Sequence, residues 1–316
     1  MRFPVAVLVG ALLFAGDAGQ DQRPTFRATA DLVAVEASVR DRTRVVTDLK
    51  ANDFELLDNG VRQEIFDLSY GKLPIDVTVA LDVSYSVTGD LLERLQRGVK
   101  ALVSDLGQAD RLRLVLFNMQ VRRVVDFTSD PAAIETAIRT ASAGGGTSIF
   151  DAISVELVSA EHSDRRQLLV VFSDGADALS TTEPPVLLEV AARSVAAVTT
   201  VLPAGPGGVR EQTILNPSGS VSRIVSAPNR ESPQQQRRRE IYRQLAAETG
   251  GIVMPMAQSG QDLAPLFRRA LDEFRSTYVL QFAPRGVKPG GFHTLRVDVP
   301  GRKGLTIRAR RGYWSD

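Results

Sequence analysis

The stretch Ile75-Asp76-Val77-Thr78-Val79-Ala80-Leu81-Asp82-Val83-Ser84-Tyr85-Ser86 decides the fold of this chain. Its first part, Ile75 to Leu81, is a mostly apolar stretch of strand length. Asp82, Ser84 and Ser86 follow directly, so one carboxylate and two hydroxyls stand where the strand ends. In open α/β sheets, ligands bind beyond the carboxyl ends of the strands. The stretch therefore predicts a strand that delivers these three side chains to a binding site.

Two later segments place further oxygen-bearing side chains at equivalent positions. Thr147 follows Gly144-Gly145-Gly146, and Asp174 follows the apolar strand Leu168 to Phe172. Glycines let a loop turn sharply and approach a site closely. Carboxylate and hydroxyl oxygens suit a hard cation such as Mg²⁺. The sequence thus predicts a Mg²⁺ site, with Mn²⁺ or Ca²⁺ as alternatives, whose ligand set is Asp82, Ser84, Ser86, Thr147 and Asp174.

The rest of the chain predicts an α/β region between two β-rich segments. From Pro74 onward, apolar strands alternate with amphipathic helices, which is typical of a doubly wound, mostly parallel sheet. Before and after this region the pattern is β, with Asp58-Asn59-Gly60 as a hairpin turn. Neither flank alone offers enough strands for a core. We therefore expect the N- and C-terminal strands to form one small β-sandwich.

These patterns divide the chain into four parts. Residues 1–20 are predicted to be a signal peptide, 21–73 an N-terminal β-rich segment, 74–276 the α/β domain and 277–316 the C-terminal strands. Within the α/β domain, residues 205–238 are rich in Gly, Pro, Ser, Asn and Gln, which predicts a flexible loop. The next helix is expected over 240–249.

The N-terminus predicts export. Arg2 supplies a positive start, Pro4 to Ala15 form a short apolar run, and Gly16-Asp17-Ala18 offers small residues for cleavage. An apolar first strand of the fold is the alternative interpretation. The run is shorter than the roughly 20 residues that a membrane-spanning helix needs. We expect a periplasmic or extracellular protein with no membrane span in the mature chain.

Composition narrows the function classes. The 316 residues carry a formal net charge of +1, which argues against nucleic acid as the partner of the whole chain. Cysteine is absent, so disulfides, thiolate metal sites and cysteine nucleophiles are excluded. We expect His162-Ser163-Asp164 to be a solvated loop rather than a catalytic triad, because a triad needs spatial convergence and not adjacency. The chain also lacks the phosphate-binding Gly-x-x-x-x-Gly-Lys pattern.

Asp82-Val83-Ser84-Tyr85-Ser86, with Thr147 and Asp174, resembles the metal-ion-dependent adhesion site of von Willebrand factor type A domains. The resemblance extends from Pro74 to Arg275 in the order of elements. It implies that Ser84, Ser86 and Thr147 coordinate directly or through water, while Asp82 and Asp174 orient bound waters. It also implies that an aspartate or glutamate of a protein partner completes the shell.

The flanks resemble a group of exported bacterial proteins, prominent in acidobacteria, that carry such a domain between β segments. This likeness rests on Asp31-Leu32-Val33, Asn52-Asp53-Phe54-Glu55 and the ending Arg310-Arg311-Gly312-Tyr313-Trp314. Members of that group are mostly of unassigned function, so the likeness indicates an architecture and not a role.

We predict a secreted protein-binding module, acting in adhesion or envelope-complex assembly, and not an enzyme. Hydroxyl ligands would leave a cation much of its charge, so that it attracts a partner's carboxylate. Tyr85, Ala176-Asp177 and the 205–238 segment are expected to set specificity. A metal-assisted hydrolase and a structural scaffold with an idle site are the alternatives. Neither the partner nor the oligomeric state follows from the sequence.

Overall fold

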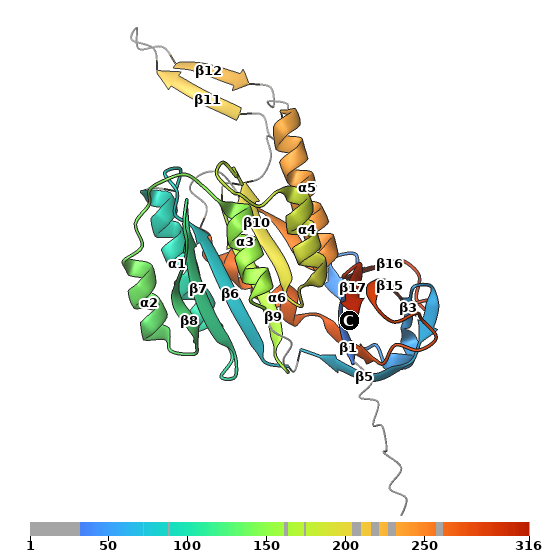
Figure 1. Ribbon diagram of the computed structural model, residues 1–316. Helices are drawn as coiled ribbons and strands as arrows, with labels where there is room; N and C mark the ends of the chain where they lie inside the picture. The colour runs from blue at the N-terminus through green and yellow to red at the C-terminus, as the bar shows by residue number, and fades with distance from the viewer. Residues whose placement is uncertain are drawn as a thin grey trace, which may run out of the picture. The chain divides into compact units, whose positions relative to one another are not determined.

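A six-stranded sheet forms the centre of the α/β region (Figure 1). The computed structural model describes residues 32–315, except 72, 88, 161–163, 174, 204–209, 216–220, 227–231 and 257–261. The strand order is β13-β10-β9-β6-β7-β8, in which β8 pairs antiparallel and the other strands pair in parallel. The strands are β6 (Ile75–Asp82), β7 (Arg111–Phe117), β8 (Val121–Thr128), β9 (Arg166–Phe172), β10 (Ala197–Pro203) and β13 (Ile252–Met256).

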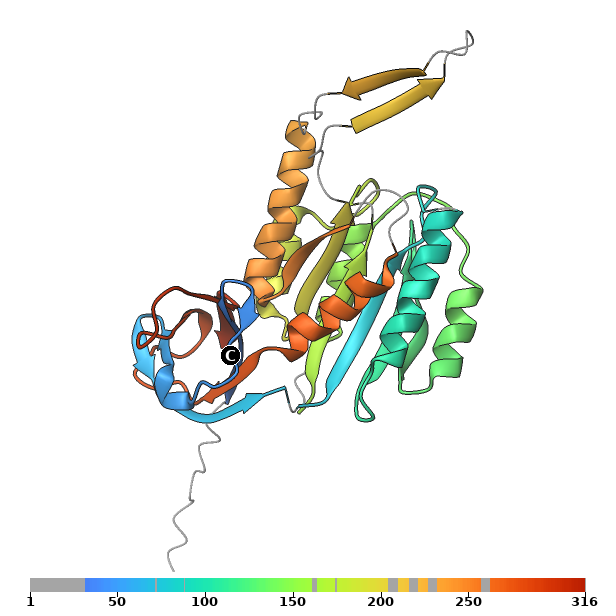
Figure 2. The same cartoon turned by 180° about the vertical axis from the view of Figure 1, so that it is seen from behind.

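Helices cover both faces of this sheet (Figures 1 and 2). One face packs against α1 (Asp90–Ser104), α2 (Pro131–Arg139) and α6 (Ala264–Arg275). The other packs against α3 (Ile149–Val158), α4 (Pro184–Arg193) and α5 (Pro233–Thr249). Every residue of β6 is buried as a result, which explains why the strand is mostly apolar. The expected α/β fold is confirmed.

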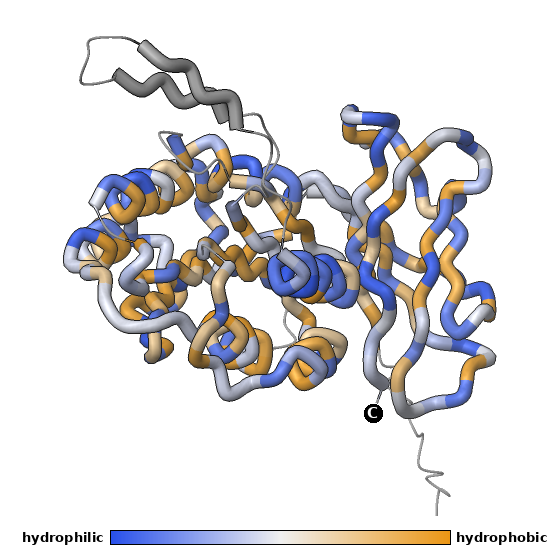
Figure 3. The backbone as a smooth tube through the Cα atoms, turned by 90° about the horizontal axis from the view of Figure 1, so that it is seen from above, coloured by the Kyte–Doolittle hydropathy of each residue, from blue (hydrophilic) through white to orange (hydrophobic). Residues whose placement is uncertain are grey.

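Strands from both ends of the described chain pair in two further sheets. One has the order β16-β1-β14-β5, with β2 beside β1, and the other β17-β15-β3-β4. Their strands are β1 (Val33–Asp41), β2 (Arg44–Val45), β3 (Glu55–Asp58), β4 (Val61–Gln63), β5 (Ile65–Tyr70), β14 (Tyr278–Phe282), β15 (Gly291–Asp298), β16 (Leu305–Ala309) and β17 (Gly312–Ser315). Figure 3 shows hydrophilic and hydrophobic residues alternating along these strands, as expected where one face of a sheet is exposed to solvent.

A buried polar cluster ties the last strand to the early ones. Asp58 and His293 are almost fully buried, and their side chains meet with 2.9 Å between Oδ1 and Nδ1. The Tyr313 hydroxyl donates to Asp58 Oδ2 at 2.8 Å. Burial, with the neighbouring Asp58 carboxylate, raises the pKa of Tyr313 well above its usual range. The tyrosine near the C-terminus therefore packs inside the β-rich part.

The prediction of one loop over 205–238 differs from the structure at residues 210–215, 221–226 and 233–238. β11 (Arg210–Leu215) and β12 (Val221–Ser226) form an antiparallel hairpin. Helix α5 begins at Pro233 rather than at 240, because Ser232 and Gln235 form a capping box and proline occupies the first turn. The polar composition of this stretch masked a helix start. Residues 204–209, 216–220 and 227–231 lie outside the described part.

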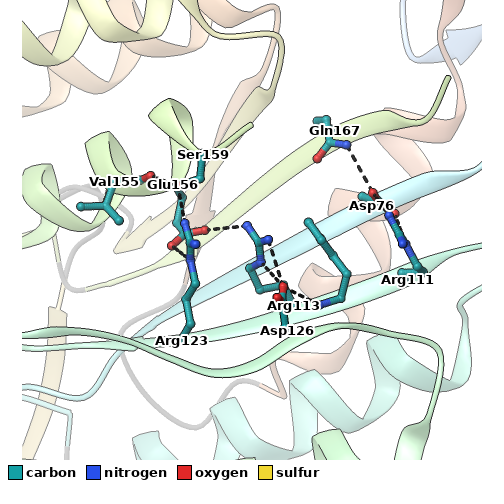
Figure 4. Close-up of polar contacts among 10 residues, drawn as sticks. Asp76, Arg111, Arg113, Arg123, Asp126, Val155, Glu156, Ser159 and Gln167 are labelled. Carbon is teal, nitrogen blue, oxygen red and sulfur yellow. Dashed lines mark hydrogen bonds and ion pairs between the residues drawn. The ribbon is translucent and has the colours of Figure 1, made fainter. Parts of the chain in front are cut away.

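Arginine–carboxylate networks hold the sheet toward the amino ends of its strands (Figure 4). Asp76, near the start of β6, accepts from Arg111 at 2.9 and 2.6 Å and from Arg165 at 2.6 Å. Glu156 of α3 accepts from Arg113 at 3.2 Å and from Arg123 at 2.8 Å. The two carboxylate side chains are only 2 % and 1 % exposed. Each buried carboxylate is thus matched by two guanidinium groups, as buried charges require.

Candidate functional site

The candidate site lies at the carboxyl ends of β6 and β9. Asp82 is the last residue of β6, and Ser173 follows β9 directly. Thr147 precedes α3, in the loop that crosses toward the end of β6. The parallel pairing of β6 with β9 sets Leu81 opposite Phe172, so the loops that follow both strands begin side by side. This is the sheet edge at which α/β folds bind their ligands.

Asp82 is fully buried and is oriented by two hydrogen bonds. The Ser84 amide donates to Oδ1 at 2.9 Å, and the Ser173 hydroxyl donates to Oδ2 at 2.6 Å. The Ser173 Oγ in turn accepts from the Gly175 amide at 3.0 Å. Both of these donors are neutral groups, and they help to fix the direction of the carboxylate. Ser173 was missed by sequence reasoning, although a hydroxyl between a buried strand and Asp174 was a usable signal.

Ser84 and Ser86 place two hydroxyl oxygens side by side. Their Oγ atoms are 3.0 Å apart, with Ser84 only 2 % exposed and Ser86 open to solvent. This separation suits a hydrogen bond. It also suits two adjacent ligands of an octahedral cation, because ligands at about 2.0–2.1 Å lie roughly 2.9 Å apart along an octahedral edge. The pair can therefore present two oxygens to a small divalent ion with little movement.

The glycine-rich loop is bonded to the segment after β6. The Gly144 amide donates to the Val83 carbonyl at 2.8 Å, and the Tyr85 amide donates to the Gly145 carbonyl at 2.9 Å. Asn118, which follows β7, donates through Nδ2 to the Gly144 carbonyl at 2.7 Å. Gly145 has φ +77°, a conformation that favours glycine. The loop is thereby held against the chain that carries Ser84 and Ser86.

Thr147 links the glycine-rich loop to the loop after β9. It is 5 % exposed, and its carbonyl accepts from the amides of Ala178 and Leu179 at 3.0 and 2.9 Å. The structure therefore brings together the segments of Asp82, Ser84, Ser86 and Thr147. The fifth predicted ligand, Asp174, lies outside the described residues.

Asp177 has a structural role at this edge that the sequence did not reveal. Its Oδ1 accepts from the Ile149 amide at 2.9 Å and from the Ser180 hydroxyl at 2.5 Å. It thus caps the first turn of α3 from another loop, a place where helices leave amides unpaired. We predicted that Asp177 helps to set specificity, but this carboxylate is engaged inside the fold.

Asp151 fixes the next part of the same loop. Its two carboxylate oxygens accept from the amides of Thr182 and Thr181 at 2.7 and 3.0 Å. Burial raises the pKa of Asp151, but the bonds from Thr182 and Thr181 outweigh burial and leave the pKa below its usual range. Together with Asp177, this carboxylate holds the 177–182 loop to the start of α3.

The donor set differs in kind from a carboxylate or imidazole cluster. Within the described part of the chain, no group of three or more His, Asp or Glu side chains is arranged to hold a metal ion. Three of the five predicted ligands are hydroxyls, and Asp82 and Asp174 are the carboxylates. Neutral hydroxyls beside one or two carboxylates are oxygen donors of the hard type. Among biological cations, this chemistry fits Mg²⁺, Mn²⁺ or Ca²⁺.

Comparison with known proteins found sequences and structures that resemble part of this chain. A curated relative, an uncharacterized protein of a Synechocystis strain, is 29 % identical over 108 residues. The match covers 33 % of this chain and 26 % of that protein, so the chain spans about a quarter of the relative's length.

Solved structures with a related fold were also found. An aerotolerance-related membrane protein of Bacteroides fragilis has 19 % identity and a TM-score of 0.45, covering 63 % of this chain and 98 % of the other. The von Willebrand domain of a type V pili tip protein of Porphyromonas gingivalis has 23 % identity and a TM-score of 0.29, covering 33 % and 39 %. The sequence model of the von Willebrand factor type A domain matches residues 77–176, a range that contains all five predicted ligands.

Proposed function

We propose that the α/β region is a metal-dependent protein-binding module, with Mg²⁺ as the cation and a partner's carboxylate as the group it binds. Ser84, Ser86 and Thr147 would hold the cation, with Asp82 and Asp174 acting through bound water. The match to the von Willebrand factor type A model supports the general part of this proposal, a protein-interaction or adhesion role. The observation that carries the metal is the pair of Ser84 and Ser86 hydroxyls, 3.0 Å apart, beside the buried and pinned Asp82.

The proposed chemistry of this site depends on ligands that neutralise the positive charge of a bound cation only in part. A bound cation held mainly by hydroxyls would keep much of its positive charge and an exchangeable position. Ser173 and the Ser84 amide hold Asp82 in one orientation, so little ordering is needed when the cation enters. The exposure of Ser86 leaves one side of the site open to a partner. Attachment, rather than turnover, is what this arrangement supports best.

A hydrolase is the second candidate, and the loops argue against it. The stretches 83–90, 118–120, 141–148 and 173–182 contain no His, Lys or Glu. General-base catalysis needs such a group within hydrogen-bond reach of the attacking water. Asp151 and Asp177, the other carboxylates near this edge, are committed to amide hydrogens of the fold. We therefore propose that the protein is not an enzyme; turnover of model esters or peptides that requires Asp82 would contradict this.

We also propose that the chain is exported, on the strength of its N-terminal signal-like pattern. Among the described helices, none is long and apolar enough to cross a membrane. Expression of the full chain with a C-terminal tag, followed by fractionation and N-terminal sequencing, tests this. Cleavage near residues 16–20 is expected, whereas an uncleaved cytoplasmic product would contradict export.

Calorimetric titration with Mg²⁺ tests the site. The parent is expected to bind saturably, and the double variant Ser84→Ala, Ser86→Ala is expected to bind about tenfold or more weakly. Ser104→Ala is the matched control, because Ser104 is an exposed serine at the end of α1 whose hydroxyl bonds only a helix carbonyl. Equal affinities for the parent and the double variant would remove Ser84 and Ser86 from the site.

A further inference from the structure

Three large apolar side chains stand exposed around the candidate site. Tyr85 is 75 %, Met119 61 % and Leu179 50 % exposed. They come from three separate loops, which follow β6, β7 and β9. We call these three residues the apolar rim. Scattered exposed apolar residues are ordinary on protein surfaces, but a group gathered at one site indicates an interaction surface.

The glycine-rich loop positions the apolar rim. A Cβ on Gly146 would lie 2.4 Å from Leu179 Cδ1, and one on Gly145 would lie 3.2 Å from Met119 Sδ. A Cβ on Gly144 would lie 3.9 Å from Tyr85 Cε1. All three rim side chains therefore rest on the backbone of the loop that ends at Thr147. Because the glycines carry no side chains, the apolar groups approach the candidate ligands closely.

Backbone hydrogen bonds hold the rim in place. The Tyr85 amide donates to the Gly145 carbonyl at 2.9 Å, and the Leu179 amide donates to the Thr147 carbonyl at 2.9 Å. The residue before Met119, Asn118, bonds the Gly144 carbonyl. A surface fixed before binding loses less conformational entropy when a partner arrives. The rim is thus built as a preformed contact surface.

The charge pattern of the surrounding loops is one-sided. The stretches 83–90, 118–120, 141–148 and 173–182 contain no Lys or Arg, but they contain the aspartates Asp90, Asp174 and Asp177. A basic side chain in these loops is therefore not available to attract a partner's carboxylate. On the proposed function, the cation supplies that attraction, and the apolar rim supplies the contact area.

We infer that the partner is a protein segment in which an aspartate or glutamate is flanked by apolar side chains that cover Tyr85, Met119 and Leu179. This inference rests on the proposed metal-dependent function and specifies its partner. Aromatic residues and methionine are enriched in interface cores, and fully covered anchors contribute most of the binding energy. Since these loops lack basic residues, added salt should weaken binding little, provided that Mg²⁺ is held constant.

Selection from a displayed library of constrained peptides tests the inference. The immobilised mature chain is incubated with the library in Mg²⁺, and bound peptides are eluted with a chelator. Enriched peptides are expected to carry Asp or Glu next to Leu, Ile, Phe or Met. Affinities of the synthesised peptides are then measured against Tyr85→Ser and against the triple variant Tyr85→Ser, Met119→Ser, Leu179→Ser.

Tyr85→Ser is expected to weaken peptide binding about tenfold or more, and the triple variant to weaken it further. Val158→Ser is the matched control, since Val158 is 73 % exposed but lies at the far end of α3. Circular dichroism and the Mg²⁺ affinity of each variant are measured in parallel. A variant that has lost its fold is replaced by Met119→Gln, which retains length while removing the apolar end.

Three outcomes would overturn the inference. If the parent binds Mg²⁺, the rim assignment alone fails when the selected peptides are acidic without apolar neighbours, or when they bind the triple variant as they bind the parent. If the purified chain self-associates in Mg²⁺ and Tyr85→Ser abolishes this self-association, the occupant of the apolar rim is a second copy of the chain. Absence of both Mg²⁺ binding and chelator-sensitive peptides would instead refute the proposed function on which the inference rests.

Discussion

The two ends of the six-stranded sheet treat buried carboxylates in opposite ways. Toward the amino ends of the strands, Asp76 and Glu156 are each bound by two arginines. Figure 4 shows Arg111 at Asp76, and Arg113 and Arg123 at Glu156. At the carboxyl ends, Asp82 is as deeply buried but is oriented by an amide and a serine hydroxyl. An arginine partner brings a positive charge to a carboxylate, whereas an amide and a hydroxyl orient the carboxylate as neutral donors. The first end has the chemistry of structural support and the second that of a cation site.

The largest expected effect is on stability, at the arginine-paired end. Arg113 contacts two carboxylates that differ in exposure: the side chain of Glu156 is 1 % exposed and that of Asp126 is 79 % exposed. Glu156→Gln removes the buried negative charge that faces Arg113 and Arg123, and it should lower the free energy of unfolding by about 3 kcal/mol. Asp126→Asn should cost about 1 kcal/mol or less, because exposed pairs contribute little.

Urea unfolding of both variants beside the parent measures this difference. Mg²⁺ affinity should be unchanged in both, since Glu156 and Asp126 lie away from the candidate ligands. Equal costs for the two substitutions would show that burial does not distinguish these carboxylates. A loss of Mg²⁺ binding in Glu156→Gln, with the fold retained, would show that the two ends of the sheet are coupled and do not act separately.

The next effect is stabilisation by the ligand. A cation that binds only the folded chain raises the free energy of unfolding by about 2.7 kcal/mol at a free concentration a hundredfold above Kd. We expect this increment in the parent and in Asp126→Asn, and its loss in Asp82→Ala. Thermal unfolding with and without Mg²⁺ measures it. An increment that survives in Asp82→Ala would place the bound cation elsewhere.

A smaller effect is expected from the residue that positions Asp82. Ser173→Ala removes the hydroxyl that donates to Asp82 Oδ2 and leaves the carboxylate itself in place. Groups that orient metal ligands typically contribute about tenfold or more to affinity. Calorimetry should therefore show weaker Mg²⁺ binding in Ser173→Ala, with Ser173→Thr closer to the parent because it retains a hydroxyl. Identical affinities in all three proteins would exclude this positioning role.

The smallest effect concerns pH at the arginine-paired end. Burial raises the pKa of Asp76, but the bonds from Arg111 and Arg165 outweigh burial and leave the pKa below its usual value of 3.8. A carboxyl with a lowered folded pKa contributes stability above its unfolded pKa and loses it as pH falls through the folded pKa. Stability should thus decline below about pH 4, and Asp76→Asn should flatten that decline. Urea midpoints measured across this range provide the test.

Much of the α/β region could be predicted from local patterns. The mostly apolar stretch Ile75 to Leu81 is readable as a buried strand, because strands covered on both faces are rich in apolar residues. The convergence of Asp82, Ser84 and Thr147 also followed, since the ends of parallel strands meet at one edge. That the side chain of Asp174 joins them stays a prediction.

Other features depended on partners far away in the sequence. Ser173 donates to Asp82, and Asp177 accepts from the Ile149 amide. A serine or aspartate in a loop does not show in the sequence which distant group it will bond. The order of the flanking sheets, in which β3 pairs with β15, is set by contacts more than two hundred residues apart. The start of α5 was marked by Ser232 and Gln235 but was hidden by polar composition.

The central claim is that Ser84 and Ser86 hold a divalent cation beside Asp82. Anomalous diffraction from crystals grown with Mn²⁺, which replaces Mg²⁺ and scatters strongly, tests it most directly. The account predicts one strong peak about 2.0–2.2 Å from both serine Oγ atoms, with Asp82 separated from it by water. A peak elsewhere, or none while the two hydroxyls remain hydrogen-bonded to each other, would contradict it.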